Sequence, residues 1–289
     1  MNDIPNRILI VGLGLMGGSI ADALSSKGYR VEALDRNPDE IDYAMKQGWI
    51  VHGETEVRKE YISSFSFIVF ALYPSILVSW MKEHIGKIAP GTLLADICGI
   101  KQPIIQEILP LLEGRDVDFV FTHPMAGKAR KGARYASKDI FPGSNFLITP
   151  TIKNKESSIR LLEAFANQIG SSQIAIVTPK EHDEMIAYVS QLTHIIAMAL
   201  MNAKAESHLD EFTGDSFRDL TRIAEMNDEM WPELFLMNQE TLLEQMDLFL
   251  HEMECVRKAI ANGSIDDLRA MMKQSTKRRE SFPSERKAK

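Results

Sequence analysis

The sequence contains few cysteines. Cys98 and Cys255 are the only two in 289 residues, and they form no CxxC pair. Zinc sites and disulfide frameworks need closely patterned cysteines, so we predict neither, and we expect no metal site. Such a low thiol content is typical of a reducing compartment and predicts a cytoplasmic location.

Positively charged side chains are also fewer than negatively charged ones. The chain has 33 Lys and Arg against 40 Asp and Glu, a formal net charge of -7 at pH 7. Nucleic-acid phosphates are bound mainly by clustered Lys and Arg, so this balance disfavours a nucleic-acid partner. One basic cluster, residues 273–289, ends the sequence, and a solvated tail explains it.

Long hydrophobic runs are interrupted. The apolar segment 8–24 imitates a signal peptide but contains Asp22 and four glycines. The uncharged stretch 61–81 has about the length of a membrane span, yet it contains five serines and Pro74. It divides better into a buried strand and a helix that begins after Pro74, as in a parallel sheet covered on both faces. We therefore expect no membrane association.

A glycine-rich turn follows the first strand-like run. Residues 7–11 lead directly into Gly-Leu-Gly-Leu-Met-Gly-Gly, after which 19–29 has helical spacing. In this arrangement Gly12 permits a tight turn, Gly14 lets the backbone approach a pyrophosphate, and Gly17 lets helix and strand pack closely. The predicted cofactor-binding residues of the turn are Gly12, Leu13, Gly14, Leu15, Met16 and Gly17.

A carboxylate ends the next predicted strand, 29–35. Asp35 lies eighteen residues after Gly17, where it can accept hydrogen bonds from adenosine ribose hydroxyls and repel a 2′-phosphate. Arg36 beside it can instead receive the phosphate of NADP. We predict NAD as the cofactor, with Asp35 and Arg36 at its adenosine end.

Further strand-like runs complete an α/β pattern before a helical region begins. They lie at 65–73, 91–101 and 117–127, and each ends in a polar or glycine-bearing turn. Thr178 and the next three residues then form a capping box with proline in the first helical turn, which predicts a helix through Lys204. The predicted fold is therefore an α/β Rossmann-type dinucleotide-binding domain over 1–178 and an all-α domain over 179–289.

The predicted helix has an apolar middle with one polar stripe. Residues 188–201 are apolar nearly all round, as in a core or a subunit interface, so we expect this helix to form the core of a homodimer. Ser190 and Gln191 share a face with His194, four and three residues further on. Buried polar groups need partners or a ligand, so a core histidine with satisfied nitrogens is the alternative for His194.

The remaining candidates for chemistry are a histidine, two arginines and a tryptophan. His123 ends a strand at the predicted ligand edge, and an imidazole with a reference pKa of about 6.5 can accept the proton that an alcohol loses together with a hydride. Arg218 and Arg222 lie four apart on a probable helix, where ordinary ion pairs are the alternative to binding a carboxylate. Trp231 is either a core aromatic or part of the substrate pocket.

Three segments together resemble the prephenate dehydrogenase family: THPMAG at 122–127, SQLTH at 190–194 and FRDLTRIA at 217–224. Their order and spacing match the family over nearly the whole chain. The resemblance implies NAD-dependent oxidative decarboxylation of prephenate to 4-hydroxyphenylpyruvate in tyrosine biosynthesis, and a helical dimerisation domain.

The resemblance also implies roles for single residues. It makes His123 the catalytic residue and His194 a second active-site histidine that helps to hold the substrate. Arg222 matches the family's substrate-binding arginine. From their positions in the sequence, we predict Gln191, Arg218 and Trp231 as further substrate contacts. His182 matches a structural histidine of a His-Asp pair.

Two departures from the family's pattern leave more than one function open. The family's usual motif has a serine that orients the catalytic histidine, but this chain has Gly99, so that hydrogen bond must come from water, Cys98 or another segment. Many members carry a histidine where this chain has Gln191, which leaves arogenate as an alternative substrate. A β-hydroxyacid dehydrogenase-like enzyme and a non-catalytic NAD-binding sensor are two further possibilities.

Overall fold

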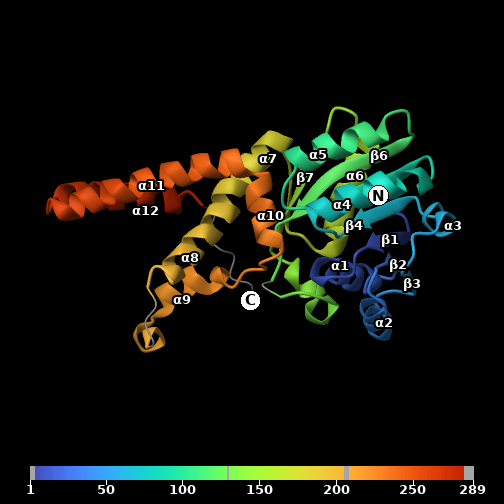
Figure 1. Cartoon of the computed structure of the whole chain (residues 1–289), viewed down its shortest axis with the longest axis horizontal. Helices are drawn as coiled ribbons and strands as arrows, with labels where there is room; N and C mark the ends of the chain where they lie inside the picture. Colours follow the sequence, from blue (N-terminus) through green and yellow to red (C-terminus); the bar gives the residue numbers. More distant parts are fainter. Residues whose placement is uncertain (1–3, 129, 205–207, 283–289) are drawn as a thin grey trace. The chain divides into compact units, whose positions relative to one another are not determined.

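The computed structural model describes residues 4–128, 130–204 and 208–282 (Figure 1). It contains two compact units, divided between Gln239 and Glu240. Over its described residues the second unit forms two helices, α11 (Gln239–Ala261, which begins one residue before the division) and α12 (Ile265–Glu280). They are joined at Gly263, which has a positive φ of 63°, and the Ser264 side chain caps α12, as is typical of a glycine after a helix and a serine before one.

The first unit is built on one sheet with the strand order β3-β2-β1-β4-β5-β6-β7-β8. All neighbouring strands are parallel except β6 and β7. The strands are β1 (Arg7–Val11), β2 (Arg30–Leu34), β3 (His52–Glu54), β4 (Phe67–Phe70), β5 (Thr92–Asp96), β6 (Val117–Pro124), β7 (Asn145–Thr149) and β8 (Gln173–Ile176).

Helices cover both faces of this sheet (Figure 1). Alternate residues of each strand point to opposite faces, so Ile8 and Ile10 belong to one hydrophobic core, whereas Leu9 and Val11 belong to the other. This explains the nearly continuous apolar strands. The first core includes residues of α1 (Leu15–Ser25), α2 (Pro38–Lys46) and α6 (Glu156–Ile169), and the second those of α3 (Lys59–Ile62), α4 (Pro74–His84) and α5 (Gln102–Ile108).

The strand order reverses between β1 and β4, and β6 extends past its neighbour β5. Val117–Val120 pair with β5, whereas residues 121–124 pair only with β7. Ligands of open α/β sheets bind at the carboxyl ends of the strands near such a reversal. The extension carries His123 to that edge.

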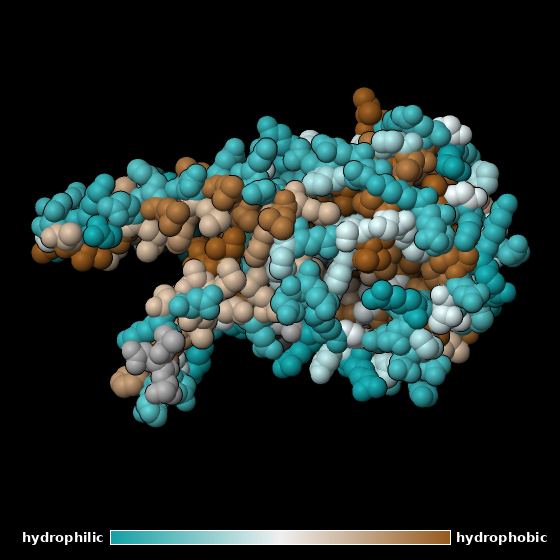
Figure 2. Space-filling model, viewed as in Figure 1, coloured by the Kyte–Doolittle hydropathy of each residue, from teal (hydrophilic) through white to brown (hydrophobic). Residues whose placement is uncertain are grey.

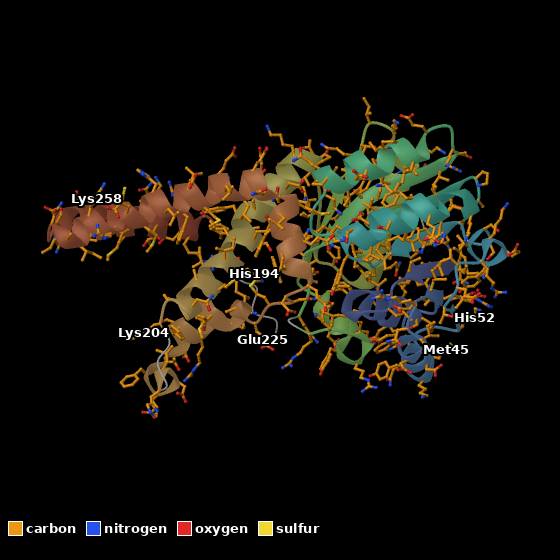
Figure 3. The ribbon with its side chains drawn as sticks, in the orientation of Figure 1. Met45, His52, His194, Lys204, Glu225 and Lys258 are labelled. Atoms are coloured by element: carbon orange, nitrogen blue, oxygen red, sulfur yellow. The ribbon has the colours of Figure 1, made fainter. Side chains whose placement is uncertain are left out.

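The helix predicted from Thr178 is present. It runs as α7 (Pro179–Ile186), a π-helical turn η5 (Ala187–Leu192) and α8 (Thr193–Asn202), which carries His194 (Figure 3). The Thr178 side chain accepts a hydrogen bond from the Glu181 backbone N–H. A π-turn inserts an extra residue into a helix and is frequent at functional sites. α9 (Asp215–Thr221) follows.

The spacing of apolar residues from Trp231 to Ala261 predicts one long amphipathic helix, and this prediction is wrong. The chain forms α10 (Met230–Met237) and α11, separated at Asn238. The Asn238 amide donates hydrogen bonds to the Asp183 carbonyl at 3.0 Å and to the Gln191 side chain at 2.8 Å. These long-range bonds hold Asn238 in a non-helical conformation.

Apolar side chains are exposed along the helix of α7, η5 and α8. Tyr188 is 57% exposed and Val189 52%, and Figure 2 shows tan and brown side chains along α8. Pro179–Asn202 is also long and apolar enough to cross a membrane by length and composition, although a single helix of this kind is weak evidence for a span. An exposed apolar face of this kind marks an interaction surface.

Two glycines of the turn after β1 provide a matched test of packing. A Cβ on Gly17 would lie 1.8 Å from the Gly12 carbonyl oxygen, whereas a Cβ on Gly14 would meet no atom within 4 Å. We expect Gly17→Ala to lower the free energy of unfolding by about 3 kcal/mol, because β1 and α1 must separate. Gly14→Ala should cost about 1 kcal/mol or less. Urea unfolding of both variants measures this, and equal losses would contradict the packing argument.

Candidate active site

The glycine turn leaves an open site at the start of α1. Gly12 has a φ of 96°, and a Cβ there would lie 2.5 Å from the Ala71 carbonyl oxygen, so this position requires glycine. The space beside Gly14 is open, and α1 begins at the next residue without a side-chain cap. Free backbone N–H groups at a helix N-terminus suit a phosphate group. In the same turn Leu13 is buried, and Leu15 and Met16 are half-buried.

Asp35 lies beside this turn. Its carboxylate accepts hydrogen bonds from the backbone N–H of Leu13 at 2.6 Å and of Asn37 at 2.8 Å. Its own N–H donates to the Glu54 carbonyl at 3.1 Å. Arg36 is exposed. The end of β2 is thereby tied to the glycine turn, as expected for a residue at the adenosine end of a dinucleotide.

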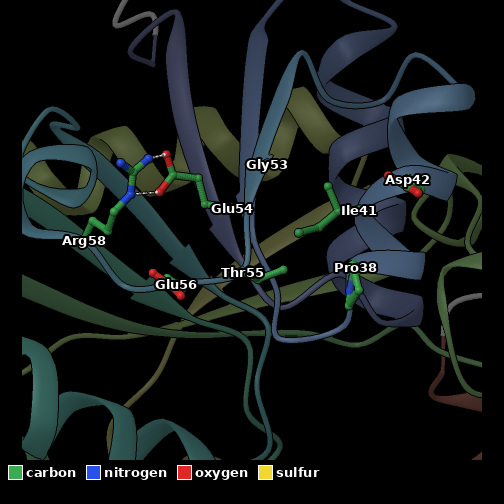
Figure 4. A pocket seen from close by; sticks show the side chains of 8 residues that line it. All are labelled: Pro38, Ile41, Asp42, Gly53, Glu54, Thr55, Glu56 and Arg58. Atoms are coloured by element: carbon green, nitrogen blue, oxygen red, sulfur yellow. Dashed lines mark hydrogen bonds and ion pairs between the residues drawn. The ribbon is translucent and has the colours of Figure 1, made fainter.

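A small open pocket of about 360 Å³ lies between α2 and the end of β3 (Figure 4). Within it Arg58 forms an ion pair with Glu54, with an Nε to Oε2 distance of 2.8 Å. Asp42 and Glu56 add further negative charge. Such surroundings disfavour an additional phosphate. The pocket is lined by Pro38, Ile41, Asp42, Gly53, Glu54, Thr55, Glu56 and Arg58.

His123 contacts a second histidine. Its Nδ1 lies 3.0 Å from Nε2 of His182, and Nδ1 of His182 lies 2.7 Å from Oδ1 of Asp183. Burial lowers the pKa of His123 well below its usual 6.5, and the nearby His182 and Lys101 lower it further. Burial also lowers the pKa of His182, although the hydrogen bond to Asp183 opposes the shift. Both imidazoles are therefore neutral at pH 7.

Buried charges surround the two histidines. The Lys101 ammonium donates hydrogen bonds to Asp96 at 2.7 Å and to the Thr122 carbonyl at 2.6 Å. The Asp183 carboxylate accepts the backbone N–H groups of Lys101 at 2.8 Å and Gln102 at 2.7 Å. Asp96, Lys101 and Asp183 are each 0% exposed. Every one of these charges is paired or hydrogen-bonded, as burial requires.

The His194 ring packs against the Trp231 ring, with the two planes tilted by 33°. The ring centroids lie 3.9 Å apart, and Nδ1 of His194 lies 2.8 Å from the Ser190 carbonyl oxygen. A carbonyl only accepts hydrogen bonds, so Nδ1 carries the proton and Nε2 is free for a ligand. Burial lowers the pKa of His194, with the opposing hydrogen bond to Ser190 and a smaller lowering effect from Arg222.

Arg222 and Arg218 differ in their surroundings. Both line an open pocket of about 670 Å³ together with Met201 and Glu225, the latter labelled in Figure 3. Arg218 lies 3.5 Å from Asp215 and donates to the Thr213 carbonyl at 3.1 Å. Arg222 is exposed and has no hydrogen-bond or ion-pair partner among the described residues. Arg222 is therefore the more available cation.

Gln191 is a packing residue in this structure. It is 1% exposed, its Nε2 donates to the Leu234 carbonyl at 3.0 Å, and its Oε1 accepts from Asn238. These bonds hold α10, the helix of Trp231, against η5. Contact with a substrate stays a prediction for Gln191, and the polar ends of its amide are already engaged within the chain.

The position of Gly99 faces His123. A Cβ there would lie 3.7 Å from Nε2 of His123 and 3.5 Å from Leu234, which leaves room for a side chain. The Cys98 thiol lies 3.5 Å from the Leu72 carbonyl oxygen, which is its hydrogen-bond acceptor. The hydrogen-bond partner of the His123 imidazole is His182. The sequence feature that could have indicated the contact between His182 and His123 is the adjacent pair His182 and Asp183 in the first turns of the helix capped by Thr178.

Comparisons with known proteins agree with this geometry. Residues 20–175 match the nucleotide-binding domain of prephenate dehydrogenase, and residues 178–274 match the prephenate dehydrogenase dimerization domain. The chain belongs to the prephenate dehydrogenase family. The predicted resemblance and the predicted fold class, an α/β nucleotide-binding domain with a helical C-terminal domain, are thereby confirmed.

Individual relatives cover nearly the whole chain. Prephenate dehydrogenase of Bacillus subtilis (strain 168) is 26% identical over 98% of this chain and 78% of that protein. Cyclohexadienyl dehydrogenase of Zymomonas mobilis is 26% identical over 94% of each protein. The structure of prephenate dehydrogenase from A. aeolicus in complex with hydroxyphenyl propionate and NAD+ has a TM-score of 0.84, 26% identity, and coverage of 95% of this chain and 97% of that one.

The lowered pKa values predict how stability depends on pH. His123 and His182 are neutral when folded, whereas the same groups in the unfolded chain bind protons below their usual 6.5. Acid therefore favours the unfolded state, and the free energy of unfolding should be constant above about pH 7.5 and fall below it. The slope is at most about 1.4 kcal/mol per pH unit for each histidine. Urea unfolding at pH 7.5, 6.5 and 5.5 measures it, and greater stability at pH 5.5 would contradict the assignment.

Proposed function

We propose that this chain is an NAD-dependent prephenate dehydrogenase that oxidises and decarboxylates prephenate to 4-hydroxyphenylpyruvate in tyrosine biosynthesis. One observation carries the proposal. A neutral imidazole, His123, lies at the same sheet edge as an open glycine turn, and α10 connects that edge to the Trp231–His194 pair. Family membership and the names of the relatives give the reaction class.

The cofactor site consists of the glycine turn and Asp35. The open N–H groups beside Gly14 would bind the pyrophosphate, and Asp35 would accept hydrogen bonds from the adenosine ribose. The negative charge of Asp42 and Glu56 nearby favours NAD over NADP. Bound NAD would supply the hydride acceptor. The A. aeolicus relative was solved with NAD+, which agrees with this choice.

His123 would act as the general base. As hydride leaves the ring carbon that bears the hydroxyl group, the imidazole takes the hydroxyl proton. It is ready to do so at pH 7 because burial keeps it neutral. The bond to the departing carboxyl group then breaks, its electron pair enters the ring, and carbon dioxide leaves as the ring becomes aromatic. A low pKa for His123 places the acid limb of the activity below pH 6.5.

Arg222 would anchor a substrate carboxylate. Prephenate carries two carboxylates, and a guanidinium that has no other partner among the described residues can bind one of them through two parallel hydrogen bonds. His194 would accept a hydrogen bond at Nε2, while its contact with the Trp231 ring keeps the imidazole in place. Arg218, which already has partners, would contribute through its charge.

The helical domain would form a homodimer. Its exposed apolar side chains lie within the segment that matches the family's dimerization domain. Burial of such a face against a second copy is favourable at roughly 25 cal/mol per Å². A cytoplasmic location is consistent with a chain whose two cysteines are both free.

The reaction is tested by NADH formation at 340 nm with purified protein. Prephenate and arogenate are offered in parallel, each with NAD and with NADP, and we expect turnover with prephenate and NAD. His123→Asn should lower kcat by about 1,000-fold, as expected for removal of a general base, while NAD binding measured by calorimetry is retained. Turnover with arogenate alone would identify arogenate as the substrate in place of prephenate. Full activity of His123→Asn would show that His123 is not the general base.

The two arginines provide a second test with an internal control. Arg222→Met should raise KM for prephenate by about 10- to 100-fold, because a charge-assisted hydrogen bond contributes roughly 1.5–3 kcal/mol. Arg218→Met should change KM by less than about 5-fold, since its guanidinium is engaged within the chain. Steady-state kinetics measure both, and a larger effect for Arg218 would reverse the assignment.

A further inference from the structure

The hydrogen bonds around His182 determine where the protons lie. The Asp183 carboxylate faces three donors, namely two backbone N–H groups and Nδ1 of His182, so it is ionised and Nδ1 of His182 carries a proton. A neutral His182 then has a lone pair on Nε2. That nitrogen lies 3.0 Å from Nδ1 of His123, which must be the donor. The remaining nitrogen of His123, Nε2, is left with a free lone pair.

The same arrangement leaves Nε2 of His123 accessible. Gly99 lies on that side of the ring, where a Cβ would already come within 3.7 Å of Nε2, and glycine provides no hydroxyl to bind there. The nearby charged groups compensate one another, because Lys101 is paired with Asp96. The accessible nitrogen is therefore the one that can act as a base.

We propose that His182 is a positioning residue for His123. Oriented by Asp183, it accepts the Nδ1 proton of His123 and so fixes both the ring orientation and the tautomer with a basic Nε2. The inference rests on the proposed function, in which His123 is the base. In this chain His182 orients the His123 ring, because Gly99 has no hydroxyl group that could do so.

Each bond broken in the proton transfer is matched by a bond formed within the series substrate, His123, His182 and Asp183. The substrate O–H bond breaks and an N–H bond forms at Nε2 of His123, which becomes an imidazolium. Its Nδ1–H bond to His182 becomes charge-assisted and strengthens. The Asp183 carboxylate at the far end stabilises the positive charge without itself being protonated. No proton needs to leave the three side chains before the hydride transfer is complete.

A purely structural role for His182 can be separated experimentally from a positioning role. Asp183 joins α7 to α5 through backbone N–H groups, and these bonds do not involve the His182 side chain. Replacing His182 therefore leaves this connection intact, whereas replacing Asp183 would not. His182→Gln keeps an acceptor oxygen near the place of Nε2, and His182→Leu removes it.

The tautomer is tested first, by long-range ¹H–¹⁵N NMR of the ¹⁵N-histidine-labelled full chain without substrate at pH 7.5. His123→Asn and His182→Gln assign the signals. We expect His123 to be protonated at Nδ1 and unprotonated at Nε2. A proton on Nε2 of His123 would overturn the proposal. This result does not depend on turnover, so it stands apart from failure of the proposed function.

Kinetics with the active substrate give the second readout. His182→Leu should lower kcat by about 100-fold, the cost of misplacing a catalytic group, with KM changed less than about 2-fold because His182 does not touch the substrate. His182→Gln should recover at least 10-fold of this loss, because its side-chain oxygen can still accept the Nδ1 proton of His123. In His182→Leu the acid limb should move to lower pH, because the His123 imidazolium loses the acceptor that stabilises it.

A buried histidine outside this line of bonds is the control. His84 on α4 is 8% exposed, and His84→Leu should leave kcat unchanged. Equal losses for His182→Leu and His182→Gln, with no movement of the acid limb, would assign His182 a structural role and reject the proposal. Absence of turnover in the unaltered protein with either substrate would reject the proposed function instead.

Discussion

At the carboxyl ends of β5 and β6, two carboxylates and an ammonium group lie out of contact with solvent. Asp96 is compensated by the Lys101 side chain, and Asp183 by backbone N–H groups at the start of α5. An uncompensated buried charge costs several kcal/mol, so these bonds severely restrict where β6, α5 and α7 can lie. Thr122 binds the cluster through both its N–H and its carbonyl, and His123 is the next residue. The position of the proposed base thus depends on this charged cluster.

A network of neutral polar side chains fixes the positions of His194 and Trp231, as the charged cluster fixes that of His123. The amides of Gln191 and Asn238 bond to each other, to the Leu234 carbonyl and to the Asp183 carbonyl. Satisfied buried amides specify one arrangement, because any other would leave donors or acceptors without partners. Through this network α10 is held against η5, and Trp231 is held over His194. Asp183 is common to both networks, through its side chain in one and its carbonyl in the other.

The electrostatics of the site are compatible with the proposed substrate, a dicarboxylate that loses one carboxylate. Burial keeps His123, His182 and His194 in their neutral forms at pH 7, so none of them adds a fixed positive charge. Lys101 is neutralised by Asp96. Arg222 remains as an available cation for one carboxylate. A site that does not stabilise the departing group too well favours the transition state over the bound substrate.

The sequence by itself determined the features that depend on near neighbours: the glycine turn, Asp35 after the second strand, the Thr178 cap, and the location of His123 at a strand end. Spacing and backbone conformation decide these within a few residues. Only the tertiary structure decided that His182 contacts His123 across 59 positions and that Asn238 divides the segment 231–261 into two helices by bonding to Gln191 across 47. Those outcomes follow from hydrogen bonds and charge compensation between distant segments, and no local pattern encodes which buried polar groups will meet.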